Sequence, residues 1–261
     1  MSVVPRGRGP GRAAPVPQAI AAMTATELRL ALRRGENLFA TIVIPTIVLV
    51  LFSSISILPT GTARAVDFLL PGTIALAIVA TSLVSLGITT AYDRSYGVLK
   101  RLGGSPLSRG ELVAARVLTV LVIEAIQIAL LVAVASVGLG WSAGPGSSIP
   151  LAILAVVLGT AAFAGLGLWM AGTLRAETVL ALANVLFLAF LVVGGVIVPI
   201  GHLPAPLGAV AAALPAAPLS ELLRIAFGAA PAGADVVSPL VLLGTWAGGL
   251  LAIASATFRW E

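Results

Sequence analysis

One acidic side chain lies deep inside a long apolar run of this sequence. At about 1.5 Å per residue, Glu124 stands roughly 18 Å into a helix that would begin near Leu112. An ionisable group at that depth of a membrane usually faces a cavity or a partner, so it is a candidate for a path taken by a solute or a proton. Glu124, Gln127 on the same helix face and Asn184 in another apolar run are therefore the candidate residues of a translocation path. For Glu124 and Gln127, a hydrogen-bond lock between helices is the competing interpretation and the one that we favour.

Several kinds of catalytic chemistry are excluded by what the sequence lacks. It has no cysteine, and its single histidine, His202, cannot build a zinc site or an HExxH motif. The only lysine, Lys100, follows Leu99 and therefore does not belong to the GxxxxGK[ST] loop that cradles the phosphates of ATP. We predict that the chain is not an enzyme and holds no catalytic residue, metal or cofactor of its own.

Charged residues also gather between two apolar runs, in residues 93–116, DRSYGVLKRLGGSPLSRGELVAAR. Asp93 is expected to cap a short helix with its apolar and basic residues on different sides. Two glycines and Pro106 would then turn the chain, and Ser108 with Glu111 forms a capping box that starts the next helix. A simple connection does not need a folded basic element, so we predict that a soluble partner binds this one.

The elements that position these residues are membrane helices. The sequence is 59% hydrophobic without glycine and only 10% charged, whereas soluble domains are roughly 45–50% apolar with glycine counted. Apolar runs of about 20 residues recur, which is the length that about 30 Å of hydrocarbon requires. The fold class is therefore all-α and polytopic. Six transmembrane spans are predicted at residues 38–58, 68–92, 112–139, 149–174, 179–200 and 236–258.

The remaining segments are shorter. Residues 1–22, rich in Pro, Gly and Arg, are predicted to be a disordered cytoplasmic tail, and residues 23–261 a single transmembrane domain. A capping box formed by Thr24 and Glu27 predicts the start of an amphipathic helix in the membrane interface. After the fifth span, repeated prolines predict short outer-face or re-entrant helices up to Asp235.

The basic residues indicate the orientation of the chain. With the N-terminus inside, every basic residue except Arg64 and Arg224 lies on the cytoplasmic side, which predicts that both termini are cytoplasmic. The net charge of +5 then reflects orientation, and no nucleic-acid partner is expected. The preference for Arg over Lys, with abundant Ala and Gly, is typical of a GC-rich bacterial genome.

Residues 91–118, AYDRSYGVLKRLGGSPLSRGELVAARVL, resemble the signature of ABC-2 type transporter permeases. The six-span layout and the broken segment after span five also resemble that family, particularly its drug and antibiotic exporters of the daunorubicin-resistance kind. The resemblance implies a coupling helix, between spans two and three, that sits in a cleft of an ATPase subunit. The matching positions are Asp93, Arg94, Gly97, Leu99, Arg101, Pro106 and Glu111. Two positions that are often acidic in the family are Ser95 and Tyr96 here.

The resemblance further implies a permease subunit of an ATP-driven exporter in the lipid of the cell membrane. Two copies of an ABC ATPase subunit would supply the ATP and Mg sites, and a second permease copy or a related permease would complete the complex. The nearly charge-free spans favour a lipophilic small molecule, such as a drug, antibiotic or lipid-like compound, and hence roles in multidrug export and antibiotic resistance. The alternative is a proton-coupled secondary transporter that uses Glu124.

Overall fold

A computed structural model describes residues 15–33, 35–54, 64–103, 108–196, 199–231 and 233–257. Within these ranges the chain forms helices and no strand, which confirms the all-α prediction. Pro106, residues 1–14 and the end of the first predicted span lie outside the described residues. In chain order the helices are α1 (Val16–Arg33), α2 (Gly35–Ser54), α3 (Ala65–Ile78), the π-helix η1 (Val79–Ser85), α4 (Leu86–Ser95), α5 (Val98–Gly103), α6 (Arg109–Gly138), α7 (Ile149–Thr173), α8 (Ala176–Val193), the 3-10 helix η2 (Ile200–His202), α9 (Ala205–Ala213), α10 (Ala216–Ala226) and α11 (Val237–Thr257).

Among the described residues, five helical segments are long and apolar enough to cross a membrane, and each coincides with a predicted span. They are α6, α7, α8, α11 and the continuous stretch from α3 through η1 to α4. The first predicted span corresponds to α2, whose apolar part, Ile42–Ser54, is shorter among the described residues. Helices α9 and α10, preceded by Pro204 and Pro215, meet at 77° as a broken span or a re-entrant pair. The predicted interruption after the fifth span is therefore confirmed.

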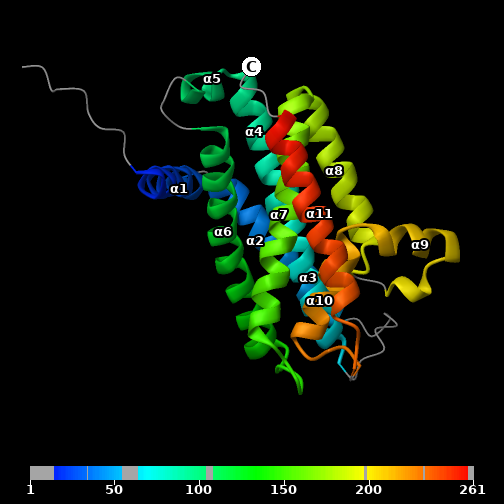
Figure 1. Ribbon diagram of the computed structural model, residues 1–261. Helices are drawn as coiled ribbons and strands as arrows, with labels where there is room; N and C mark the ends of the chain where they lie inside the picture. Colours follow the sequence, from blue (N-terminus) through cyan, green and yellow to red (C-terminus); the bar gives the residue numbers. More distant parts are fainter. Residues whose placement is uncertain are drawn as a thin grey trace, which may run out of the picture.

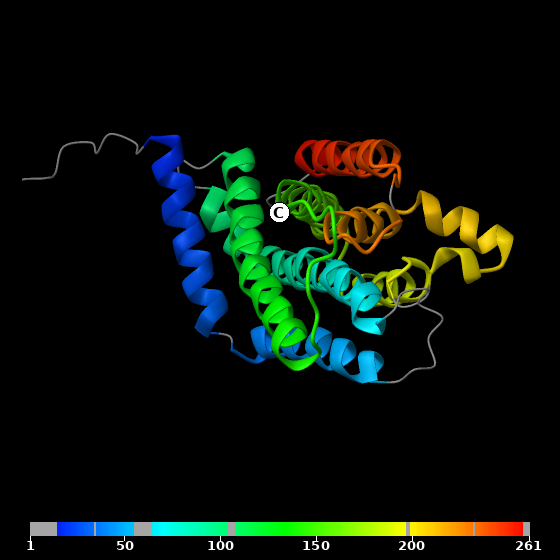
Figure 2. The ribbon, with the colours of Figure 1, turned by 90° about the horizontal axis from the view of Figure 1, so that it is seen from below.

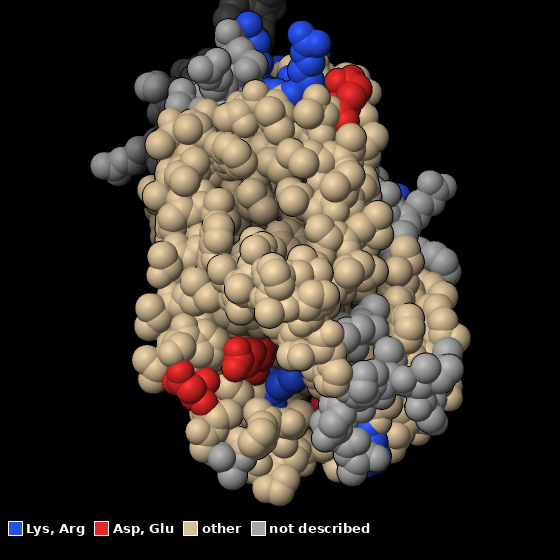
Figure 3. Space-filling view, turned by 90° about the vertical axis from the view of Figure 1, so that its right-hand side faces the viewer, with Lys and Arg blue, Asp and Glu red and all other residues tan. Residues whose placement is uncertain are grey.

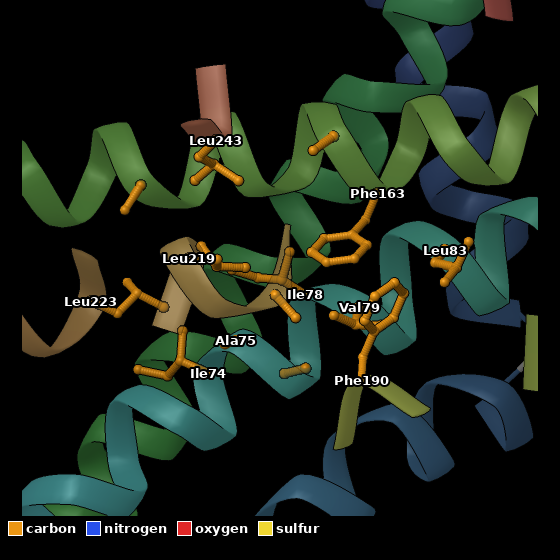
Figure 4. Close-up of a cluster of buried hydrophobic side chains, with 14 of the residues drawn as sticks. Ile74, Ala75, Ile78, Val79, Leu83, Phe163, Phe190, Leu219, Leu223 and Leu243 are labelled. Atoms are coloured by element: carbon orange, nitrogen blue, oxygen red, sulfur yellow. The ribbon is translucent and has the colours of Figure 1, made fainter. Parts of the chain in front are cut away.

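Helix α7 lies at the centre of the bundle, against η1, α4, α10 and α11 (Figures 1 and 2). Its glycines allow this approach: a Cβ at Gly165 would lie 2.9 Å from the backbone of Leu250 in α11, and one at Gly167 would lie 3.0 Å from a backbone oxygen of Leu83 in η1. On one side of α7 the rings of Phe163 and Phe190 meet edge to face at 5.3 Å between centroids, within a cluster of buried apolar side chains (Figure 4). This core holds η1 against α7.

The GxxxG sequence of α11, Gly244 to Gly248, makes no such contact. A Cβ added at either glycine would meet nothing within 4 Å in the described part of the chain. The close packing of α11 depends instead on Gly165 of α7. Within the described residues, the Gly244 face of α11 is therefore left without a close helix neighbour.

Helix α1 packs beside the first part of α6 and is inclined to it (Figures 1 and 2). The predicted helix start at Thr24 is wrong, because α1 begins at Val16 and includes residues 16–22, which were expected in the disordered tail. Pro17 is tolerated in a first turn, where its missing N–H is not needed, and good helix formers follow it. The Thr24 hydroxyl donates to the Ala115 carbonyl of α6 at 3.3 Å and is not a cap.

On the surface seen in Figure 3, the charged residues lie towards the two ends of the bundle. Figure 3 shows one face on which a broad uncharged band separates Lys, Arg, Asp and Glu side chains above and below it. Such a band is what the hydrocarbon of a bilayer requires. Helix α5 and the C-terminal end of α11 lie at one end, called the α5 end below, and α10 lies towards the other, the α10 end (Figure 1).

Candidate functional site

The short helix α5 projects at one end of the bundle, where the predicted coupling helix was expected. Helix α4 ends at Ser95, and Gly97 turns the chain into α5 with a φ of +71°, a left-handed conformation that favours glycine. In α5 the side chain of Leu99 is fully buried, whereas Lys100 and Arg101 are exposed. Helix α5 therefore buries the apolar side chain of Leu99 against the bundle and exposes its two basic side chains.

The segment that carries α5 is fixed to the bundle by Arg116, a residue that sequence reasoning counted only as one more loop charge. Its side chain is 2% exposed, and its guanidinium donates to the Asp93 carboxylate at 2.6 Å and to the Thr90 hydroxyl, both in α4. Glu27 of α1 lies 3.5 Å away. The predicted cap role of Asp93 is wrong, because α4 continues through Asp93 and the carboxylate binds Arg116. One cation thus joins α1, α4 and α6.

Two further predicted coupling residues also hold the local structure together. Arg94 donates to the Leu174 carbonyl at the end of α7. The capping box that starts α6 is confirmed, since the Ser108 N–H donates to Glu111 Oε2 at 2.7 Å and the Glu111 N–H donates to Ser108 Oγ at 3.3 Å. Among the predicted coupling residues that the structure describes, Arg101 has an exposed side chain. The others either hold the segment that carries α5 against the bundle or turn the chain within it.

A second candidate site is a cluster of polar side chains in the middle of the bundle. Glu124 of α6 is fully buried, accepts from the Ser82 hydroxyl of η1 at 2.6 Å, and also contacts the Thr160 hydroxyl of α7. Gln127, one turn on, lies 3.0 Å from the Thr81 hydroxyl of η1. We call these five residues the buried polar cluster. Two of the three predicted path residues belong to it, and it joins α6 to α7 and to the π-helical segment of the chain.

The third predicted path residue, Asn184, lies elsewhere. Its amide Nδ2 donates to the Leu180 carbonyl at 2.7 Å, and its side chain is exposed on α8. It lines a groove of about 370 Å³, called the lateral groove below. The lining residues are Ile44 and Pro45 of α2, Ala80, Val84 and Ser85 of η1, Ile88 and Thr89 of α4, and Leu180, Asn184 and Phe187 of α8. The structure therefore separates Asn184 from Glu124 and Gln127, with η1 bordering both sites.

The α10 end carries a larger hollow, of about 940 Å³, that sequence reasoning missed. Phe68, Trp141 and His202 contribute to its lining, together with Arg224, whose guanidinium lies 3.9 Å from the Phe68 ring centroid. Arg224 also donates to the Gly195 carbonyl and so ties α10 to the end of α8. Nowhere in the described part of the chain do three His, Cys, Asp or Glu side chains come together as a metal site would require.

Comparison with known proteins identifies the family of the chain. No curated protein matches it. The family model described as ABC-2 type transporter matches residues 18–227, which is most of the 261-residue chain and runs from α1 to just beyond α10. The match includes the α5 segment, the buried polar cluster and the lateral groove. The chain therefore belongs to the ABC-2 type transporter family and is the membrane subunit of an ABC-type transporter.

Proposed function

We propose that this subunit exports a lipophilic compound, such as a drug, an antibiotic or a lipid-like molecule, across the cytoplasmic membrane with energy from a separate ATPase subunit. In this proposal the α5 end faces the cytoplasm, as the distribution of basic residues predicts. Two ATPase copies and a second permease copy or a related permease complete the transporter, as in the daunorubicin-resistance exporters that the sequence resembles.

The observation that carries the proposal is the way α5 is held. A six-residue helix is too short to be stable alone in water. Here it follows a glycine turn, buries Leu99, and leaves Lys100 and Arg101 exposed on a segment fixed through Arg116. A basic element on a rigid base suits docking to an acidic or polar cleft of a soluble protein, because little ordering remains to be done on binding.

The lateral groove supports the choice of substrate class. Its lining is mostly apolar but includes Ser85, Thr89 and Asn184. Polar groups exposed at membrane depth are costly against lipid, so a face that carries them is best explained by a solute path or by a second subunit. A groove with an apolar wall and a few polar groups suits an amphipathic, largely apolar compound.

A charge-reversal experiment tests the coupling role of α5. The double variant Lys100→Glu with Arg101→Glu should lose co-purification with the ATPase subunit and ATP-dependent export, because both side chains are exposed and their reversal would repel an acidic cleft. The matched control is Arg29→Glu with Arg33→Glu, the same charge change on the exposed side of α1. The control should still co-purify with the ATPase subunit and should still support ATP-dependent export.

The same experiment discriminates the alternative mechanism. A proton-coupled transporter that uses Glu124 would export its substrate without any ATPase subunit and would stop when an uncoupler collapses the proton gradient. Normal complex formation and export by the α5 double variant would reject α5 as the coupling element. Export that persists in membranes without the ATPase would reject the ATP-driven proposal itself.

A further inference from the structure

We propose that Glu124 carries a proton and that, as a neutral carboxylic acid, it is a positioning residue that holds η1 in its π-helical form and so shapes the wall of the lateral groove. The protonation of Glu124 and its effect on η1 do not depend on the proposed export function. Only the idea that the groove wall contacts a substrate rests on the proposed function.

The hydroxyl hydrogens around Glu124 support a proton on its carboxyl group. Thr160 has one hydroxyl proton but lies against two oxygen atoms, the Val156 carbonyl at 2.8 Å and the Glu124 carboxyl. If Thr160 donates to Val156, as threonine commonly does within helices, its oxygen is left as an acceptor towards Glu124. A protonated Glu124 then donates through Oε2 to Thr160 and accepts through Oε1 from Ser82. Every polar atom in this chain of hydrogen bonds is satisfied.

An ionised Glu124 would lack the ion pair that a buried carboxylate needs. Glu124 is fully buried, and the ion pairs found among the described residues involve Arg64 and Arg116, not Glu124. A carboxylate without a cation in an apolar interior is strongly disfavoured, and taking up a proton removes that penalty. The burial of Glu124 and the hydrogen-bond pattern therefore lead to the same protonation state.

The cluster contacts the part of the helix whose geometry is unusual. η1 spans Val79–Ser85, and π-helical turns of this kind are rare, often occurring at functional sites. One face of η1 places Thr81 and Ser82 against Gln127 and Glu124, whereas Val84 and Ser85 lie at the lateral groove. Hydrogen bonds on the buried face thus hold the segment whose other face forms part of the groove.

A change in helix type would move the groove residues. A π-helical turn contains about one residue more than an α-helical turn, and one residue corresponds to a rotation of about 100° around the axis. If η1 relaxed to α-helical geometry, the side chains that follow the π-helical turn would rotate by about 100° around the helix axis relative to α3. Ser85 would then leave the groove wall. Glu124 therefore acts on the groove through Ser82 without touching its contents.

The absence of cysteine allows a direct test in the full chain. Ser85→Cys supplies one reporter thiol at the groove, and its rate of maleimide labelling is measured in membranes. With Glu124→Gln the rate should stay within about twofold, because the amide can donate to Thr160 and accept from Ser82. With Glu124→Leu, or with Ser82→Ala if the leucine variant does not fold, the rate should change roughly fivefold to a hundredfold, the factor for losing a buried hydrogen bond.

Infrared spectroscopy provides the second measurement. The purified wild type should show a protonated-carboxyl stretch that shifts in heavy water and is missing from Glu124→Gln. A spectrum without that band at neutral pH would overturn the assignment of the proton, and unchanged labelling in both Glu124→Leu and Ser82→Ala would overturn the positioning role. Neither readout needs transport, so failure of this inference is distinguishable from failure of the ATP-driven proposal.

Discussion

Replacing Arg116 with methionine should destabilise the subunit and detach the α5 segment from the bundle. Methionine keeps an unbranched side chain but removes the cation that faces Asp93 at 2.6 Å and Glu27 at 3.5 Å. Removing one partner of a buried ion pair costs about 3–5 kcal/mol. The two carboxylate side chains are 18% and 20% exposed, and water reduces the penalty. We therefore expect a loss of about 2–3 kcal/mol in the free energy of unfolding.

The measurement is denaturant unfolding of the purified subunit in detergent, followed by co-purification with the ATPase subunit. Because α4 leads directly to α5, loss of the Arg116–Asp93 contact should weaken ATPase binding even under conditions where the subunit stays folded. Adding Asp93→Asn to Arg116→Met should restore about 1–2 kcal/mol of the free energy of unfolding, because the second change removes the carboxylate that has lost its cation.

The matched control is Arg64→Met at the α10 end. Arg64 pairs with Asp67 at 3.0 Å and donates to the Gly140 carbonyl, but its side chain is 46% exposed, and exposed pairs contribute only about 0–1 kcal/mol. The view that burial makes Arg116 structurally important would be refuted by either of two results. One is a decrease in the free energy of unfolding below about 0.5 kcal/mol for Arg116→Met, and the other is an equal decrease for Arg116→Met and Arg64→Met.

Two further variants test the helix start and the helix packing. Ser108→Ala removes a confirmed cap of α6 and should lower the free energy of unfolding by about 1 kcal/mol in the same denaturant assay; an unchanged value would show that Ser108 does not stabilise the helix start. Gly165→Val should disrupt the contact of α7 with Leu250 and lower the yield of folded subunit in size-exclusion chromatography, because the added atoms meet backbone. Gly244→Val is its control and should fold normally, since its surroundings are open; equal behaviour of the two valine variants would contradict the packing account.

The membrane fold could be predicted because its cause is local. Apolar runs long enough to cross a bilayer are visible in the chain itself, and five of the six predicted spans coincide with helices of sufficient length and apolarity. The Ser108–Glu111 capping box could be predicted for the same reason, since its partners are three residues apart. The Thr24–Glu27 box had the same sequence pattern and failed, because a proline-containing first turn started α1 earlier.

The roles of individual polar residues could not be read in this way. Arg116 and Asp93 are distant in sequence, and only the meeting of α4 and α6 makes one the partner of the other. Sequence reasoning grouped Asn184 with Glu124 because both are polar residues in apolar runs, yet their side chains lie in different sites bordered by η1. The π-helical form of η1 was not indicated by any apolar period of the sequence, and the side chains of α6 that bind its hydroxyl groups lie 42 and 46 residues further along the chain.

The sequence by itself therefore determined that the chain crosses a membrane, where its main helices lie, and where a basic segment interrupts them, because these properties depend on hydrophobicity and neighbouring residues. Tertiary structure alone decided which polar side chains meet. It placed the Arg116 guanidinium between two acids, gave Glu124 two hydroxyl neighbours and no ion pair with any described residue, and left Asn184 at a groove. The physical reason is that hydrogen bonds and ion pairs act over a few ångströms, and helix packing brings together residues that the sequence holds far apart.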